Sequence, residues 1–206
     1  KLGKLHTALA EKKKGVVVIY IREEIEAKHI YADIKGRMLI LEIKIGQRQI
    51  LLVYIYAPNK NQKEFYKKLH ERIVETGQKD ICIVGDYYGI IETIKDYVCD
   101  NKNLKKRNTL RQTFFDMTEE LNLIDVWRTL NPMEQKFTYY SNSHKSYSRI
   151  DMVWRNIDIG KEIEKIEILP NTWADHNPIK VSWRSQKKKR KRWTLNPQIL
   201  LEEEFI

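Results

Sequence analysis

The apolar residues of this chain gather in short runs of strand length, and this pattern limits the fold more than any other feature of the sequence. Residues 15–21 form one such run, rich in valine and isoleucine, which is typical of a buried strand. No run approaches the ~18 consecutive apolar residues of a membrane-spanning helix. Apolar and aromatic residues make up 42% of the 206 positions, enough for a real core, which excludes disorder over most of the chain.

The patterns predict more strands than helices. A helical period with charges between the apolar positions predicts a helix over residues 63–75, and a second helix is expected over 112–121, continuing towards Trp127. Residues 95–111 are polar and basic without a clear period and are interpreted as a loop. No glycine-rich phosphate loop is present. The arrangement favours an α/β or α+β sandwich over a doubly wound parallel sheet. The predicted strands are 15–21, 37–45, 49–56, 80–84, 136–140, 148–154, 164–169 and 178–183.

The net charge of +10 is unevenly distributed. Seven positive charges lie between residues 184 and 192, three glutamates follow at 202–204, and the remainder up to residue 183 carries about +6. We therefore expect one domain over 1–183 and a basic linker over 184–206. Such charge suits a polyanion, DNA or RNA, bound through its phosphates, although a solvated linker remains the alternative. The candidate DNA-binding residues of the linker are Lys187, Lys188, Lys189, Arg190, Lys191 and Arg192.

Only two cysteines occur, which excludes a disulfide scaffold or a four-cysteine zinc site and favours a reducing, intracellular compartment. The first residues hold no initiator methionine and no apolar signal segment. The chain is therefore expected to be processed or to be a piece of something longer. Neither a membrane nor a disulfide-linked partner is expected.

Polar residues at three predicted strand ends could carry chemistry. Asp86 follows a buried strand, where a carboxylate can bind a hard cation or act as a base, although a turn aspartate after glycine is commoner. Asp151 alternates with two apolar neighbours and could simply face solvent. His176, in an Asp-His pair before a proline, could donate to a phosphate or carry a proton, or have no role. Tyr56 ends a strand, where a tyrosine is usually part of the core or its rim.

The order of these features is more specific than any one of them. Residues 55–59 (Ile-Tyr-Ala-Pro-Asn), Gly85-Asp86, residues 148–151 (Ser-Arg-Ile-Asp) and Asp175-His176 together resemble the exonuclease–endonuclease–phosphatase superfamily. More closely, residues 1–183 look like the apurinic-type endonuclease domain of LINE-1 retrotransposons. The linker resembles the segment that leads to their reverse transcriptase.

The resemblance implies a four-layer αββα sandwich and cleavage of a DNA phosphodiester with Mg²⁺ or Mn²⁺. It implies that Asp86 orients the attacking water and helps to hold the metal, and that Asp175 lies at the metal site. His176 would hydrogen-bond the phosphate, with Asp151 holding it in orientation, and Tyr56 would contact the phosphate.

The resemblance also places Thr138 near the DNA-binding surface, and the family and the basic run together imply a nuclear location.

Several departures from the family pattern bear on activity. The family's early Asn-x-Asn-Gly motif and its Gln-Glu-Thr motif, which carries the main metal ligand, do not occur, and residues 1–14 align downstream of both. Gly-Asp-Phe-Asn reads Gly85-Asp86-Tyr87-Tyr88, so Tyr88 replaces an amide beside the scissile phosphate. Ala174 stands where many members have serine. We therefore expect an N-terminally truncated, degraded copy with little or no activity; the alternative is a non-catalytic nucleic-acid-binding remnant.

Overall fold

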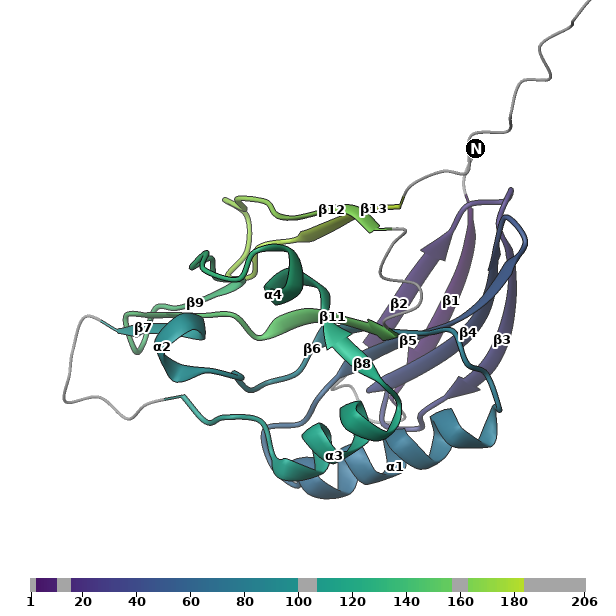
Figure 1. Cartoon of the computed structure of the whole chain (residues 1–206), viewed down its shortest axis with the longest axis horizontal. Coiled ribbons are helices and arrows are strands. Elements are labelled where there is room, and N and C mark those ends of the chain that lie inside the picture. Colours follow the sequence, from purple (N-terminus) through teal and green to yellow (C-terminus); the bar gives the residue numbers. More distant parts are fainter. Residues whose placement is uncertain (1–2, 11–15, 100–106, 157–162, 184–206) are drawn as a thin grey trace, which may run out of the picture.

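A central sheet of six strands organises the molecule (Figure 1). The computed structural model describes residues 3–10, 16–99, 107–156 and 163–183. Within the sheet β5 and β6 run parallel, while the other neighbouring strands are antiparallel. In spatial order the strands are β3 (Glu26–Ala32), β4 (Met38–Ile45), β5 (Arg48–Tyr56), β6 (Ile81–Asp86), β11 (Asp151–Asn156) and β8 (Leu123–Asp125).

Two helices cover one face of this sheet. α1 (Gln62–Glu75) makes the crossover between the parallel strands β5 and β6, and α3 (Gln112–Glu120) lies beside it (Figure 1). Tyr66 and Leu69 of α1 and Phe114 of α3 are completely buried against apolar side chains of the sheet. The helical spacing of these residues is what lets each helix turn one stripe towards the core.

Strand hairpins cover the opposite face. β1 (Lys4–Leu9) pairs with β2 (Val16–Ile21), and β12 (Ile163–Ile168) pairs with β13 (Ile179–Trp183). Together with α4 (Val126–Leu130) they bury the alternate side chains of the central sheet in a second core. Because both faces are covered, β4 is apolar at nearly every position. The predicted fold class, a mixed α+β protein made mostly of sheet, is confirmed.

Several expected elements differ in their bounds. The second predicted helix ends at Glu120 instead of continuing to Trp127, because Asn122 adopts a left-handed backbone (φ 51°), and β8 follows. Asparagine tolerates this conformation better than most residues. The predicted loop at 95–111 begins as regular structure, with α2 (Thr93–Asp96) and β7 (Tyr97–Cys99). β1 and β3, which are largely polar on one side, were not predicted.

The predicted strand 148–154 is interrupted. Its beginning belongs to β10 (Ser146–Ser148), which lies between β7 and β9 (Tyr139–Ser141) in a small sheet, and its remainder is β11. The break at Arg149 occurs because this residue turns inward to an ionic network instead of continuing either ladder.

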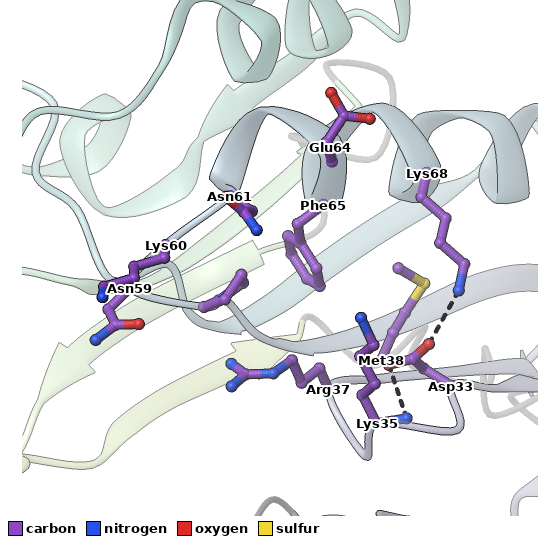
Figure 2. Close-up of a pocket in the computed structure, with 11 residues that line it drawn as sticks. Asp33, Lys35, Arg37, Met38, Asn59, Lys60, Asn61, Glu64, Phe65 and Lys68 are labelled. Carbon is purple, nitrogen blue, oxygen red and sulfur yellow. Dashed lines mark hydrogen bonds and ion pairs between the residues drawn. The ribbon is translucent and has the colours of Figure 1, made fainter.

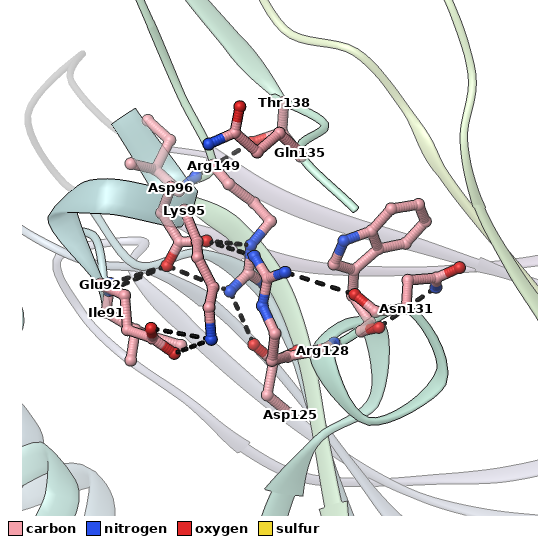
Figure 3. A network of polar contacts seen from close by, with 12 residues as sticks. Ile91, Glu92, Lys95, Asp96, Asp125, Arg128, Asn131, Gln135, Thr138 and Arg149 are labelled. Atoms are coloured by element: carbon pink, nitrogen blue, oxygen red, sulfur yellow. Dashed lines mark hydrogen bonds and ion pairs between the residues drawn. The ribbon is translucent and has the colours of Figure 1, made fainter. Parts of the chain in front are cut away.

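That network is buried and joins three parts of the chain (Figure 3). Arg149, 1% exposed, donates from Nε to Oδ1 of Asp96 at 2.9 Å and forms an ion pair with Asp125 at 2.7 Å. Asp96, also 1% exposed, accepts a further hydrogen bond from the guanidinium of Arg128 at 2.8 Å. Burial raises the pKa of Asp96, but its hydrogen bonds to Arg149 outweigh burial and hold that pKa below its ordinary value. α2, β8 and the start of β11 are thereby held together.

The described part of the chain contains no helix long and apolar enough to span a bilayer. Cys82 is buried and Cys99 is half-buried, and the described residues contain no disulfide bond between them.

The substitution Asp96→Asn is expected to lower the free energy of unfolding by about 3–5 kcal/mol, because it removes one of the two carboxylates paired with the buried Arg149 and leaves only Asp125. Urea denaturation followed by circular dichroism measures the change. The matched control is Glu92→Gln, which removes the exposed ion pair between Glu92 and Lys95 on the same turn and should cost about 1 kcal/mol or less. Equal losses in the two variants would contradict this role of the network.

Candidate active site

Three adjacent strands of the central sheet place polar side chains in one row. Tyr56 ends β5 and lies opposite Asp86, the last residue of β6, which in turn lies opposite Asp151, the first residue of β11. Residues in register on neighbouring strands point to the same face. In each of these strands this is the face covered by the hairpins, because Tyr54, Val84 and Val153, two residues away, pack in the second core.

Asp86 is the most enclosed carboxylate of the row. Its side chain is 8% exposed, and Oδ1 accepts a hydrogen bond from the backbone N–H of Tyr88 at 2.7 Å. Burial, followed by the neighbouring charge of Asp151, raises the pKa of Asp86 to about 6, against the opposing influence of the Tyr88 amide, His176 and Arg107. The carboxylate is therefore still mostly ionised at neutral pH and is a stronger base than an ordinary aspartate.

His176 pairs directly with Asp151. Its Nδ1 lies 2.8 Å from Oδ2 of Asp151, and its side chain is 36% exposed. This hydrogen bond raises the pKa of His176 above its ordinary value, against burial, with further support from the charges of Asp86 and Asp175. With Nδ1 engaged by the carboxylate, Nε2 is the ring nitrogen left to meet a ligand.

The loop that carries His176 is fixed by backbone hydrogen bonds to β9 and its flank. The N–H of Tyr140 donates to the carbonyl of Asp175 at 2.9 Å, and the N–H of Asn177 donates to the carbonyl of Thr138 at 2.7 Å. The side chain of Asn171 donates to the carbonyl of His176 at 2.7 Å. These bonds account for the defined place of a histidine that lies outside regular structure.

Thr138, which the resemblance places near the DNA-binding surface, has a structural contact with the row. It is completely buried, and its Oγ1 accepts hydrogen bonds from the N–H groups of Ile150 and Asp151, each at 3.0 Å. Thr138 thereby fixes the backbone that presents Asp151.

A further group at the site was missed by the sequence analysis. The guanidinium of Arg107 lies over the rings of both Tyr88 and Tyr139, 5.1 Å from each centroid, and the Tyr139 ring contacts that of His176 at 4.8 Å. Arg107 falls in the segment interpreted as a loop. No local pattern marks it, because its aromatic partners are distant in sequence.

The residues at the row fit a loosely held divalent cation. Asp86 and Asp151 bring two carboxylates side by side. Burial is the main cause of the raised pKa of Asp86, and the charge of Asp151 is the second; a cation would relieve that repulsion. Asp175 is exposed beside His176. Among the residues that the structure describes, no three histidine, cysteine, aspartate or glutamate side chains form a metal-binding group. Mg²⁺ commonly uses one or two carboxylates and keeps several waters, so this donor set suffices for weak binding.

Two cavities adjoin the row. One, of about 560 Å³, lies beneath β13 and is lined by Tyr54, Val84, Asp151 and His176 among others. The other, of about 400 Å³, is bounded by Lys35, Arg37, Lys60 and Lys68 together with Asp33 and Glu64 (Figure 2). Arg37 connects this basic pocket to the row, since it donates to the carbonyl of Tyr56 at 3.4 Å and lies over the Tyr56 ring. The basic residues 187–192 expected to bind DNA lie outside the described residues.

Comparison with known proteins places this geometry in a context. No protein-family model matches the chain. A curated relative, the uncharacterized 149 kDa protein of transposon TX1 from Xenopus laevis, is 26% identical over 179 residues, which are 84% of this chain. The chain spans 13% of the length of that relative.

Solved structures share the fold at low identity. The AP endonuclease of Leishmania major superposes with a TM-score of 0.74 at 14% identity, covering 88% of this chain and 70% of its own. The endonuclease domain of TRAS1, a telomere-specific non-LTR retrotransposon, gives a TM-score of 0.66 at 18% identity, with coverage of 89% and 81%. The 3′ phosphatase NExo from Neisseria, bound to a product DNA hairpin, superposes with a TM-score of 0.64 at 15% identity. The superposition covers 87% of this chain and 79% of NExo.

These likenesses agree with the resemblance found in the sequence: the chain shares its fold with AP endonucleases and with a retrotransposon endonuclease domain, and its sequence is similar to part of a transposon protein.

Proposed function

We propose that the site is a DNA phosphodiester-cleaving centre of the retrotransposon endonuclease type, and that this chain as given works slowly at best. The observation that carries the proposal is the His176–Asp151 pair, which lies beside Asp86 at one end of the sheet, where Asp86 has a raised pKa of about 6. A carboxylate-held imidazole next to a second, buried carboxylate supplies both a donor for a phosphate oxygen and a base for water.

His176 and Asp151 act as one unit in this proposal. Because Asp151 engages Nδ1 and favours the imidazolium, Nε2 donates a hydrogen bond to a non-bridging oxygen of the phosphate, where negative charge grows in the transition state. Tyr56, 41% exposed at the end of β5, offers its hydroxyl to the same phosphate. The backbone bonds that fix residues 175–177 keep this donor in place before the substrate arrives.

Asp86 orients the attacking water and accepts its proton. Its pKa of about 6 lets it serve as a base at neutral pH, and the Tyr88 amide holds one of its oxygens so that the other faces the ligand. Asp86, with Asp175 nearby, would hold Mg²⁺ or Mn²⁺; when bound, the cation polarises the phosphate and lowers the pKa of coordinated water.

Two features of the described residues favour low activity. The carboxylates available for a cation are few, so the metal is weakly held. Tyr88 stands in a left-handed conformation (φ 53°) that suits asparagine better than tyrosine, and its ring stacks on Arg107 instead of offering an amide donor. Loss of one such donor in other enzymes lowers the rate by ~10²–10³.

A non-catalytic nucleic-acid-binding protein is the second candidate. The net charge of +10 and the basic pocket around Lys35, Arg37 and Lys60 support it. In both cases we propose one domain over 1–183 followed by a basic linker over 184–206 that adds affinity for DNA or RNA, in a nuclear protein. Cleavage of DNA separates the two candidates, since the second predicts binding without it.

The chain as given is expected not to nick supercoiled plasmid detectably in Mg²⁺ or Mn²⁺, and Tyr88→Asn by itself is not expected to restore nicking. The substitution returns one amide but leaves the metal weakly held. Agarose-gel relaxation of plasmid measures the rate. Robust nicking by the unmodified chain, abolished by His176→Ala, would show that the site works with the carboxylates described here and that the proposed low activity is wrong.

Activity is expected when Tyr88→Asn is combined with an N-terminal fusion to the upstream segment of a related endonuclease domain, which supplies an asparagine and a metal-binding glutamate. In that fusion protein, His176→Ala and Asp86→Asn should each abolish nicking, because they remove the phosphate donor and the base. His144→Ala, at an exposed turn, is the matched control and should leave the rate unchanged. If the folded fusion protein binds DNA and never cleaves it, the binding function is the correct one.

A further inference from the structure

We propose that Arg107, whose guanidinium lies over the rings of Tyr88 and Tyr139, binds a DNA phosphate adjacent to the one that His176 contacts. This inference rests on the proposed function and adds to it a second phosphate site on the same strand.

The side chain is held in a stack. Its guanidinium carbon lies over both rings, 5.1 Å from the centroid of each. Contacts of this kind favour arginine over lysine, because the guanidinium is flat and more weakly hydrated. A side chain that already contacts two rings loses less conformational freedom when a ligand arrives.

The hydrogen-bond donors at the edge of that plane are left for a ligand. Among the residues that the structure describes, no carboxylate lies within ion-pair distance of Arg107 and no hydrogen bond from its guanidinium is formed, although the side chain is only half exposed. Other arginines near the site are engaged by partners within the protein: Arg149 and Arg128 bind Asp96. A planar fork of free N–H groups matches two oxygens of a phosphate.

The backbone on either side fixes the stack close to the row. The N–H of Ile90 donates to the carbonyl of Asn108 at 3.2 Å, and the N–H of Leu110 donates to the carbonyl of Ile90 at 2.8 Å. A Cβ at Gly89 would approach the Leu110 side chain to 2.9 Å, so glycine allows the two segments to lie this close. Arg107 is thus attached to the turn that directly follows Asp86.

The arrangement of Arg107 and His176 around Tyr139 indicates a strand of phosphates as the ligand. The Tyr139 ring contacts both side chains, with Arg107 over it at 5.1 Å and the His176 ring against it at 4.8 Å. Two donor side chains that contact the same aromatic ring suit two neighbouring negative charges, as successive phosphates of one strand provide, better than a single compact anion. Specific and non-specific protein–DNA contacts alike go mostly to phosphates.

The test measures binding of a short fluorescent DNA duplex in EDTA, where no cleavage occurs, over a range of salt concentrations. Arg107→Gln should raise Kd about 5–10-fold and reduce the slope of log K against log salt by about 0.9, the value for one lost phosphate contact. Arg107→Lys should keep the slope and raise Kd about 2–3-fold, since the charge remains while the stacked fork is lost.

Arg72→Gln is the matched control. Arg72 also lies over a tyrosine, Tyr31, at 4.9 Å, but it is paired with Glu75 in the last turn of α1, at the opposite end of the sheet from Asp86. The Kd of Arg72→Gln and its slope of log K against log salt should equal those of the unmodified chain. If Arg107→Gln binds like the control, Arg107 contacts no phosphate and the inference is wrong, whether or not the fusion protein cleaves DNA. If Arg107→Gln lowers the slope while no form cleaves DNA, the phosphate site stands and the catalytic proposal falls.

Discussion

The buried ionic network around Arg149 is the constraint on which the functional end of the molecule depends. Arg149 lies two residues before the start of β11, and its bonds to Asp96 and Asp125 fix the point at which the chain leaves the small sheet and enters the central one. The desolvation of a completely buried arginine is unfavourable unless every charge is matched, so this geometry tolerates little displacement. Asp151 is the first residue of this strand, so the network also fixes its position.

The need to cover both faces of the central sheet determines the rest of the site. The helices bury one set of alternate side chains, and the hairpins bury the other. Tyr56, Asp86 and Asp151 belong to the hairpin side but lie at the end of the sheet, where the second core stops. Asp86 is consequently buried enough to have a raised pKa while its neighbour His176 remains open to a ligand. A buried carboxylate and a ligand-accessible histidine can therefore lie side by side, because the apolar layer ends at this edge of the sheet.

The sequence predicted the strongly apolar elements well and the weakly patterned ones poorly. β4, β5 and β6, buried on both faces, and α1, with its clear helical period, were found close to their observed bounds. β3 was missed because its residues are largely exposed or only partly buried and its apolar residues do not alternate regularly, and α2 because a four-residue helix has no period to detect. The end of α3 depends on one backbone conformation at Asn122, which composition does not reveal.

The same distinction applies to the site. Tyr56, Asp86, Asp151 and His176 could be selected as candidates because they lie in recognisable motifs in a recognisable order, and the structure places them at one end of the sheet. Arg107 was missed since its position depends on tertiary stacking with Tyr88 and Tyr139, and the buried role of Thr138 was missed because a hydroxyl accepting two backbone N–H groups leaves no mark in the sequence. Contacts between distant segments therefore account for most of what the sequence did not predict.

The central claim is that Asp151 and His176 form one charged unit at the end of the sheet, and nuclear magnetic resonance of the ¹⁵N-labelled imidazole tests it most directly. A pH titration should give His176 a pKa above 6.5, with the proton retained on Nδ1. In Asp151→Asn the pKa should fall, because the hydrogen bond to Asp151 is the largest of the influences that raise it and burial lowers it. A His176 pKa at or below 6.5 in the unmodified chain, unchanged by Asp151→Asn, would contradict the account.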